Sequence, residues 1–159
     1  MDKLLKLLDT DARLTNAQLA VMLDKTEAEV AAQIAAWERE GVIRAYKALI
    51  DWDKTSSEKV TALIEVKVTP QRGLGFDKIA ERIYNYPEVN AVYLISGSYD
   101  LLVTIEGRTL REAAQFVSDK LSPLESVLST KTNFILKKYK DHGTIMAEKE
   151  KDERMLMTP

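Results

Sequence analysis

The apolar residues change their spacing once along the chain, and this change restricts the possible folds more than any other feature of the sequence. Up to about residue 53 they recur every three or four positions, as Leu4, Leu7 and Leu8 do, which is the period of an amphipathic helix. From Val60 to Val68 they alternate with polar residues, which is the period of a half-buried strand. The sequence therefore predicts a helical domain over residues 1–53 and a sheet-containing domain that begins at residue 54.

Capping boxes mark two helix starts in the first domain. Thr15 with Gln18, and Thr26 with Glu29, form the S/T-x-x-E/Q pattern, in which the hydroxyl accepts from a first-turn N–H and the longer side chain reaches back. The stretch LDK before Thr26 leaves room for only a tight turn, as in a helix-turn-helix. The stretch EREGVIRAYKALID, residues 38–51, then predicts the end of the second helix followed by a β wing.

The second domain has the element order βαββαβ. Alternating stretches predict strands near residues 59–70, 88–96, 99–107 and 126–139, and helical spacing predicts helices over 75–86 and from Thr109 onward. The apolar residues expected to face the sheet are Phe76, Ile79, Ala80 and Ile83 in the first helix and Leu110, Ala113, Ala114, Val117 and Leu121 in the second. This order predicts an α+β fold of the ferredoxin-like kind over residues 54–140, with one sheet face free to pair with another subunit.

Residues 141–159 form a charged C-terminal tail. A run of alternating charge is usually a solvated helix or a disordered end. The apolar residues Met155, Leu156 and Met157 near its end are candidates for docking on a neighbouring subunit.

Three stretches resemble the Lrp/AsnC family, the feast/famine regulators: LTNAQLAVML, EREGVIRAYKALID and PEVNAVYLISGSYDLLVTI. The likeness runs from about Leu4 to Tyr139. It implies a transcriptional regulator with an N-terminal winged helix-turn-helix that binds double-stranded DNA and a RAM-type regulatory domain. It also implies a homodimer that assembles into octamers and responds to a small-molecule effector, often an amino acid.

The expected recognition helix departs from the family at its outer face. The family usually has Arg or Lys where this chain has Ala32, Gln33, Ala35 and Ala36, and residues 1–54 contain 8 Lys+Arg against 10 Asp+Glu. Three interpretations remain open: weak DNA contacts multiplied by assembly, an alanine surface that packs on a protein partner, or unselected drift to the best helix former. The candidate DNA-binding residues are Arg13, Lys25, Thr26, Gln33, Arg39, Arg44 and Lys47.

The stretch ISGSYDLLV carries the candidate effector site. By the resemblance, the loop of Ser96, Gly97, Ser98, Tyr99 and Asp100 lies between dimers and helps to form an amino-acid pocket. Gly97 permits a positive φ, and successive N–H groups there are suited to a carboxylate, although an ordinary hairpin turn explains the same residues. Asp100 is suited to an ammonium group or to capping the turn. Thr130 and Thr132 are further candidates for the same ligand, with strand propensity as the alternative.

An enzyme is the alternative from a different class, and the sequence offers little for it. There is no cysteine, and the lone His142 predicts a surface turn more than a catalytic or metal-binding group. The stretch RGLGFD, residues 72–77, lacks the third glycine of a dinucleotide fingerprint and predicts a helix-entry loop. We therefore expect no catalysis, cofactor or metal. The first ten residues have too short an apolar run for a secretory signal, and no segment is apolar enough to span a membrane, so we expect a cytoplasmic protein without membrane contact. The net charge of −2 argues against tight non-specific binding of nucleic acid.

Overall fold

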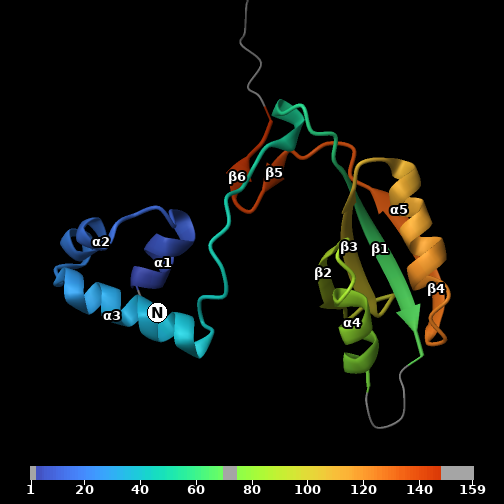
Figure 1. The fold of residues 1–159 in the computed structure, drawn as a ribbon, viewed down its shortest axis with the longest axis horizontal. Coiled ribbons are helices and arrows are strands. Elements are labelled where there is room, and N and C mark those ends of the chain that lie inside the picture. The colour runs from blue at the N-terminus through green and yellow to red at the C-terminus, as the bar shows by residue number, and fades with distance from the viewer. Residues whose placement is uncertain (1–2, 70–74, 148–159) are drawn as a thin grey trace, which may run out of the picture. The chain divides into compact units, whose positions relative to one another are not determined.

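The computed structural model describes residues 3–69 and 75–147, and Figure 1 shows the order of their helices and strands. The contacts divide the chain into two compact units, Met1–Leu49 and Ile50–Pro159. This division falls slightly before the domain boundary expected at residue 53. Each unit has a core of its own.

The first unit contains three helices, α1 (Lys3–Thr10), α2 (Asn16–Leu23) and α3 (Glu27–Glu40). Their buried residues are Leu4, Leu19, Ala20, Val30 and Trp37. Both predicted capping boxes are confirmed: Gln18 N donates to Thr15 Oγ1 at 3.2 Å, and Glu29 N donates to Thr26 Oγ1 at 3.2 Å. Only Asp24, Lys25 and Thr26 connect α2 to α3, so the tight turn is also confirmed, with Asp24 in the left-handed region at φ 52°.

The predicted β wing is wrong. After α3 the chain turns at Gly41, whose φ is 70°, and residues 44–51 contain no strand. A β wing needs two strands joined by a turn, but no Gly, Pro, Asn or Asp lies between Val42 and Ile50. The segment is instead extended, and the Tyr46 hydroxyl donates a hydrogen bond to Glu38 Oε1 of α3 at 2.9 Å.

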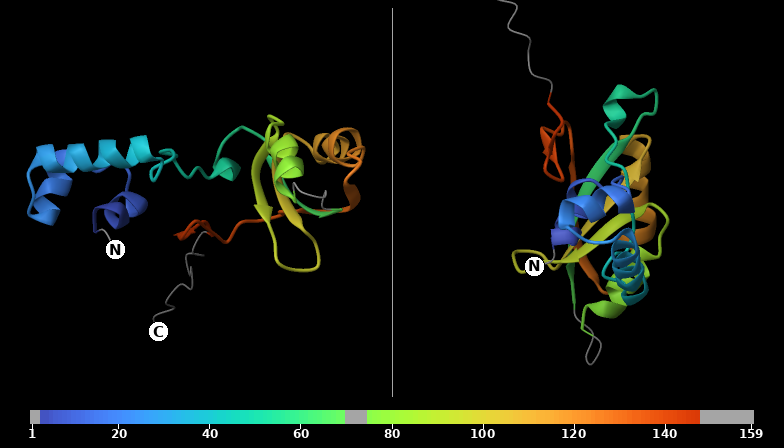
Figure 2. Two further views of the ribbon diagram at one scale, coloured as in Figure 1. Left: turned by 90° about the horizontal axis from the view of Figure 1, so that it is seen from below. Right: turned by 90° about the vertical axis from the view of Figure 1, so that its left-hand side faces the viewer.

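The second unit has the expected order of elements. It contains η1 (Trp52–Lys54), β1 (Val60–Val68), α4 (Asp77–Tyr84), β2 (Val89–Leu94), β3 (Leu101–Gly107), α5 (Leu110–Phe116), η2 (Val117–Leu121) and β4 (Val127–Phe134). The antiparallel sheet has the strand order β2-β3-β1-β4, which is the ferredoxin-like arrangement. Helices α4 and α5 lie on the same side of the sheet (Figure 2), and their Ile83, Ala113 and Phe116 join the core with Ile64 and Val103.

The inward face of α5 differs from the prediction. Ala113 and Leu121 are buried as expected, but Leu110 is 55% exposed and Ala114 is also exposed, whereas Phe116 is buried. Helix α5 continues into η2, a π-helix, which changes the residue spacing assumed for a regular α-helix. Thr109 caps α5 by accepting from Glu112 N at 3.1 Å.

The expected C-terminal tail begins inside a small hairpin. Strands β5 (Lys140–Asp141) and β6 (Thr144–Ile145) pair around His142 and Gly143, which have φ values of 42° and 82°. Two successive positive φ values form the tight turn that hairpins favour, so the surface turn predicted at His142 is confirmed. The tail residues Met155, Leu156 and Met157 lie outside the described residues.

Candidate functional site

The outer face of α3 exposes fewer alanines than the sequence predicted. Val30 and Trp37 are buried and Ile34 packs against the same core. Ala28 and Ala32 are exposed, whereas the predicted outer residues Ala35 and Ala36 are half-buried, as is Gln33. The surface free for a partner is therefore narrower than a helical wheel suggests.

The N-terminus of α3 is closed by its own side chains. The carboxylate of Glu29 accepts from Thr26 N at 2.8 Å and from the Thr26 hydroxyl at 2.7 Å. The backbone and side-chain hydrogen bonds from Thr26 hold the pKa of Glu29 below its ordinary value. Both donors of Thr26 thus serve a helix cap, and its contact with DNA stays a prediction. Glu27 adds a second negative charge in this first turn.

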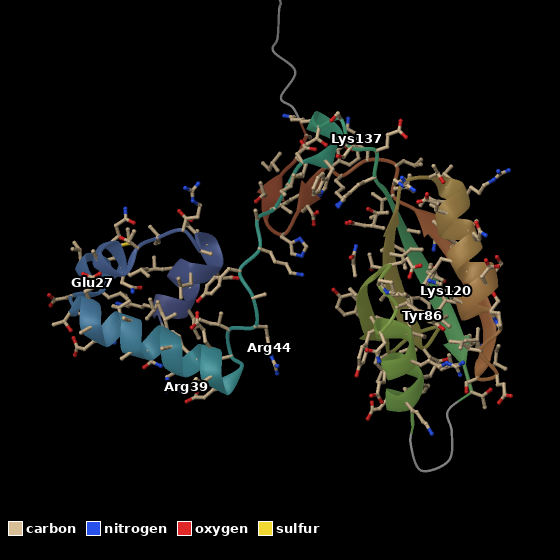
Figure 3. The ribbon with its side chains drawn as sticks, in the orientation of Figure 1. Glu27, Arg39, Arg44, Tyr86, Lys120 and Lys137 are labelled. Atoms are coloured by element: carbon tan, nitrogen blue, oxygen red, sulfur yellow. The ribbon has the colours of Figure 1, made fainter. Side chains whose placement is uncertain are left out.

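The candidate cations are spread along the first unit. Lys25 precedes α3, Arg39 lies in its last turn, and Arg44 and Lys47 follow it. Figure 3 shows Glu27 and Arg39 near opposite ends of α3, with Arg44 beyond its C-terminal end. Since α3 has 14 residues, its length is about 21 Å, so these cations do not form one compact patch. Arg13 is exposed between α1 and α2.

Arg44 and Lys47 lie on a segment that is attached to α3. The guanidinium of Arg44 packs on Gly41, where an added Cβ would come within 3.2 Å of Arg44 Cζ. Burial and the hydrogen bond to Glu38 raise the pKa of Tyr46, one residue before Lys47. Sequence analysis missed both residues: Gly41 is the left-handed C-cap of α3, which a glycine at a helix end can reveal, whereas the contact of Tyr46 with Glu38 is visible only in the structure.

The candidate effector loop, residues 96–100, is held to the sheet by Asp100. Asp100 N donates to Val66 O at 3.1 Å, and Asp100 Oδ2 accepts from Val68 N at 2.8 Å, where the β1–β4 register shifts. The side chain of Asp100 does not cap the turn as considered from the sequence; it accepts from a backbone N–H of β1, and its contact with an ammonium group stays a prediction. Gly97 does not use the positive φ that a glycine permits: the positive φ values among the described residues occur at other positions.

Thr130 and Thr132 lie on the helix-covered side of the sheet. They pair with Val66 and Ile64 of β1, whose side chains are buried beneath the helices. Leu101 pairs with Val66 from the opposite side of β1. Two strand spacings, about 10 Å, therefore separate Thr130 from the start of β3. Both threonines are half-buried, and their contact with an effector stays a prediction.

A lysine held over two aromatic rings was not foreseen. Lys120 Nζ lies 5.3 Å from the ring centre of Tyr86 and 5.7 Å from that of Phe116, and it donates to Glu88 Oε1. The rings meet edge to face, with their centres 5.7 Å apart. The hydrogen bond from Lys120 lowers the pKa of the Glu88 carboxyl group. Tyr86 and Glu88 precede Lys120 by more than thirty positions, so no local pattern reveals the cluster.

The described part of the chain contains neither a group of side chains placed to bind a metal ion nor a helix suited to cross a membrane. Within residues 3–69 and 75–147, no group of three or more His, Cys, Asp or Glu side chains is placed to hold a metal ion. None of the helices formed by these residues is long and apolar enough to cross a membrane.

Comparisons with known proteins agree with this architecture. The family model for the Lrp/AsnC ligand binding domain matches residues 61–145. The HTH-type transcriptional regulator YugG of Bacillus subtilis is 49% identical over 158 residues, which cover 99% of this chain and 95% of that protein. The leucine-responsive regulatory protein of Rhizobium meliloti is 27% identical, over 87% of this chain and 88% of its own.

A solved structure shows the same fold. The transcriptional regulator NMB0573 of Neisseria meningitidis, solved as a complex with L-Met, superposes with a TM-score of 0.73 at 23% identity. The match covers 91% of this chain and 96% of that one. The family model and the YugG relative establish that this chain belongs to the Lrp/AsnC family.

Proposed function

We propose that this protein is a DNA-binding transcriptional regulator whose second unit senses a small effector, an amino acid. The observation that carries the proposal is the pair α2 and α3, joined by three residues and capped at both starts, in a chain 49% identical along its length to an HTH-type regulator. The short connection and the two caps support a helix-turn-helix, whose second helix would enter the major groove.

The proposed DNA contacts use the half-buried Gln33 and the exposed Ala28, Ala32, Arg44 and Lys47 of the first unit. Gln33 contacts a base edge, the methyl groups of Ala28 and Ala32 pack on thymine methyls, and Arg44 and Lys47 bind phosphates. So few cations give weak binding for each unit, because each phosphate contact adds only about 0.9 to the salt slope. Assembly through the free face of the sheet, first to a homodimer and then to an octamer, raises the affinity by presenting several units together.

The effector site lies at the loop of residues 96–100. The backbone N–H groups of Ser96, Gly97, Ser98 and Tyr99 bind the effector carboxylate, and the second carboxylate oxygen of Asp100 accepts from its ammonium group. Thr130 and Thr132 add hydrogen bonds. The L-Met complex of the structural relative supports an amino acid as the ligand class. Binding between dimers changes the spacing of the DNA-binding units and so couples the two sites.

The test is binding of the full chain to tiled short duplexes, at several salt concentrations and with amino acids present or absent. Gln33→Ala should weaken sequence-specific binding about tenfold and relax specificity at one position. Arg44→Ala should weaken binding to all sequences and reduce the salt slope by about 1, whereas Arg82→Ala, an exposed arginine of α4, should change neither. Absence of DNA binding even at low salt would refute the proposal for the first unit.

A second candidate is that the alanine face of α3 contacts a protein instead of DNA. Two observations favour it. Residues 1–54 contain more acidic than basic residues, and on the neighbouring helix α2 Val21 is 84% exposed and Met22 is 56% exposed. A large residue in place of Ala32 would then abolish a protein contact, while Gln33→Ala and Arg44→Ala would leave DNA affinity unchanged.

A further inference from the structure

A basic segment follows β4 and has no part in the function proposed so far. Residues 137–140, KKYK, are the only four successive residues of the sequence that include three lysines or arginines. Residues 137–147 contain 3 Lys and 1 His against 1 Asp. By contrast, residues 1–54 contain 8 Lys+Arg against 10 Asp+Glu. The chain therefore has a local excess of positive charge, but this excess is in the second unit.

The β5–β6 hairpin holds this segment in place. Tyr139 O accepts from Met146 N at 3.0 Å and from Ala147 N at 3.3 Å, and β5 pairs with β6 beyond these bonds. The side chain of Tyr139 is 68% exposed, and Lys137 Nζ lies 5.2 Å from the centre of its ring. The segment thus presents a phenol hydroxyl beside lysines on a backbone that is already ordered.

The one acid of the hairpin is bound within it. The carboxylate of Asp141 contacts Lys138 Nζ at 3.2 Å and His142 Nδ1 at 2.8 Å. Lys137 and Lys140 are exposed, and neither forms an ion pair with a residue that the structure describes. Because Asp141 offsets the charge of Lys138, these two lysines leave positive charge for an anionic partner.

The basic segment lies against the start of the second unit. Ile50 and Trp52 line a cavity of 500 Å³ together with Lys137, and Figure 3 labels Lys137 at this place. The cavity lining contains 4 Lys against 3 Asp or Glu, so it adds no excess of negative charge. Lys47, a candidate phosphate contact of the first unit, precedes Ile50 by three residues, which span at most about 11 Å. The segment is therefore near the covalent connection to the proposed DNA-binding unit.

We propose that residues 137–140 bind the phosphate backbone of the duplex that the first unit binds, through the ammonium groups of Lys137 and Lys140 and the hydroxyl of Tyr139. This inference rests on the proposed DNA-binding function and adds a second contact surface to it. Phosphate contacts carry no base sequence, but each adds about 0.9 to the salt slope. A first unit poor in cations thus obtains part of its phosphate contacts from the second unit.

The experiment measures binding of the full chain at several salt concentrations to the tightest duplex of the tiled set and to a scrambled duplex of the same length. Lys137→Gln with Lys140→Gln should reduce the salt slope by about 2 and weaken binding to both duplexes equally. Lys137→Arg with Lys140→Arg should keep the slope, because arginine retains the charge. The matched control, Lys78→Gln with Arg111→Gln, removes two exposed charges from α4 and α5 and should change neither quantity.

Tyr139→Phe tests the hydroxyl separately. The variant loses one hydrogen bond to phosphate, so affinity for both duplexes should fall about fivefold. The salt slope should not change, because a neutral hydroxyl displaces no counterion. Unchanged affinity would remove Tyr139 from the proposed surface.

The outcomes distinguish this inference from DNA binding itself. If the wild type does not bind DNA even at low salt, the proposed function fails, and this inference fails with it. If the wild type binds and the double glutamine variant keeps the full slope, only the role of residues 137–140 is overturned. An equal loss of slope in the control variant would assign the effect to net charge and overturn this role too. Loss of assembly in the double glutamine variant, measured by size-exclusion chromatography, would assign the segment to a protein partner and also overturn it.

Discussion

The contacts that stabilise the two units span different distances along the sequence. In the first unit, the capping boxes join residues three positions apart, and five buried residues from short helices form the core. In the second, Val68 binds Asp100 across 32 positions, and Asn133 binds Glu65 across 68. Local chemistry therefore specifies the first unit, while long-range pairing specifies the second. Substitutions that act on one unit alone can test this difference.

The largest effect is expected from Ile64→Ala in the second unit. Ile64 is fully buried in β1, which pairs with both β3 and β4. Loss of a buried Ile side chain costs about 2–5 kcal/mol of unfolding free energy, because of lost transfer free energy and the cavity left behind. Leu63→Ala, the next residue on the opposite sheet face and only half-buried, should cost less.

Thermal unfolding followed by tryptophan fluorescence measures this effect in each unit. Trp37 lies in the core of the first unit, and Trp52 lies beneath Lys59 in the second, with Lys59 Nζ 3.8 Å from its ring centre. A Trp52→Phe background leaves Trp37 as the reporter of the first unit. Ile64→Ala should leave the Trp37 transition in place, and an equal shift of both transitions would show that the units unfold together.

The next effect is expected from Asp100→Ala, which removes a long-range hydrogen bond. The N–H of Val68 would lose its acceptor near a register shift of the sheet, and an unsatisfied buried donor costs about 1–3 kcal/mol. Denaturant unfolding of the second unit should show this loss. Asp77→Ala, an exposed acid in the first turn of α4, is the control, and an equal loss in both variants would contradict a structural role for Asp100.

A smaller effect is expected from Thr26→Ala in the first unit. The variant loses the N-cap of α3, which costs about 1 kcal/mol. The Trp37 transition should move to lower temperature while the second unit is unchanged. Thr55→Ala, at an exposed position of the second unit, should leave the Trp37 transition unchanged. If Thr26→Ala does not lower the Trp37 transition, the capping box contributes little to the first unit.

These distances also explain which predictions from the sequence held. Both capping boxes and the alternation of β1 depend on residues close in the chain, and both were predictable. The β wing failed because a helix end followed by extended residues resembles a wing, while the bond from Tyr46 to Glu38 is visible only in the structure. Asp100 was considered as a cap of its own turn, but its side chain binds Val68 on another strand, which no local pattern shows. The contacts of Lys120 with Tyr86 and Glu88 depend on how η2 packs against the segment between α4 and β2.

Acid should weaken the first unit through Glu29. Its folded-state pKa is depressed by the hydrogen bonds from Thr26, so its contribution to stability is present above the unfolded pKa, about 4.3, and is lost as the pH falls through the folded value. The melting temperature of the Trp37 transition should therefore drop more for the wild type than for Glu29→Gln between about pH 6 and about pH 3. Parallel curves for the two proteins would show that the carboxylate charge is unimportant.

The smallest effect on stability is expected from Gly97→Ala. Gly97 does not have a positive φ, and an added Cβ would meet only Ile95 Cγ2, at an ordinary contact distance of 3.5 Å. The unfolding free energy should therefore change by no more than about 0.5 kcal/mol. Gly41→Ala is the contrast, since φ is 70° there and the new Cβ would approach Arg44, so it should cost about 1 kcal/mol. If Gly97→Ala folds normally but loses amino-acid binding or assembly, the glycine serves the approach of an effector or a second subunit. If it is instead markedly unstable, the loop has a conformational requirement of its own.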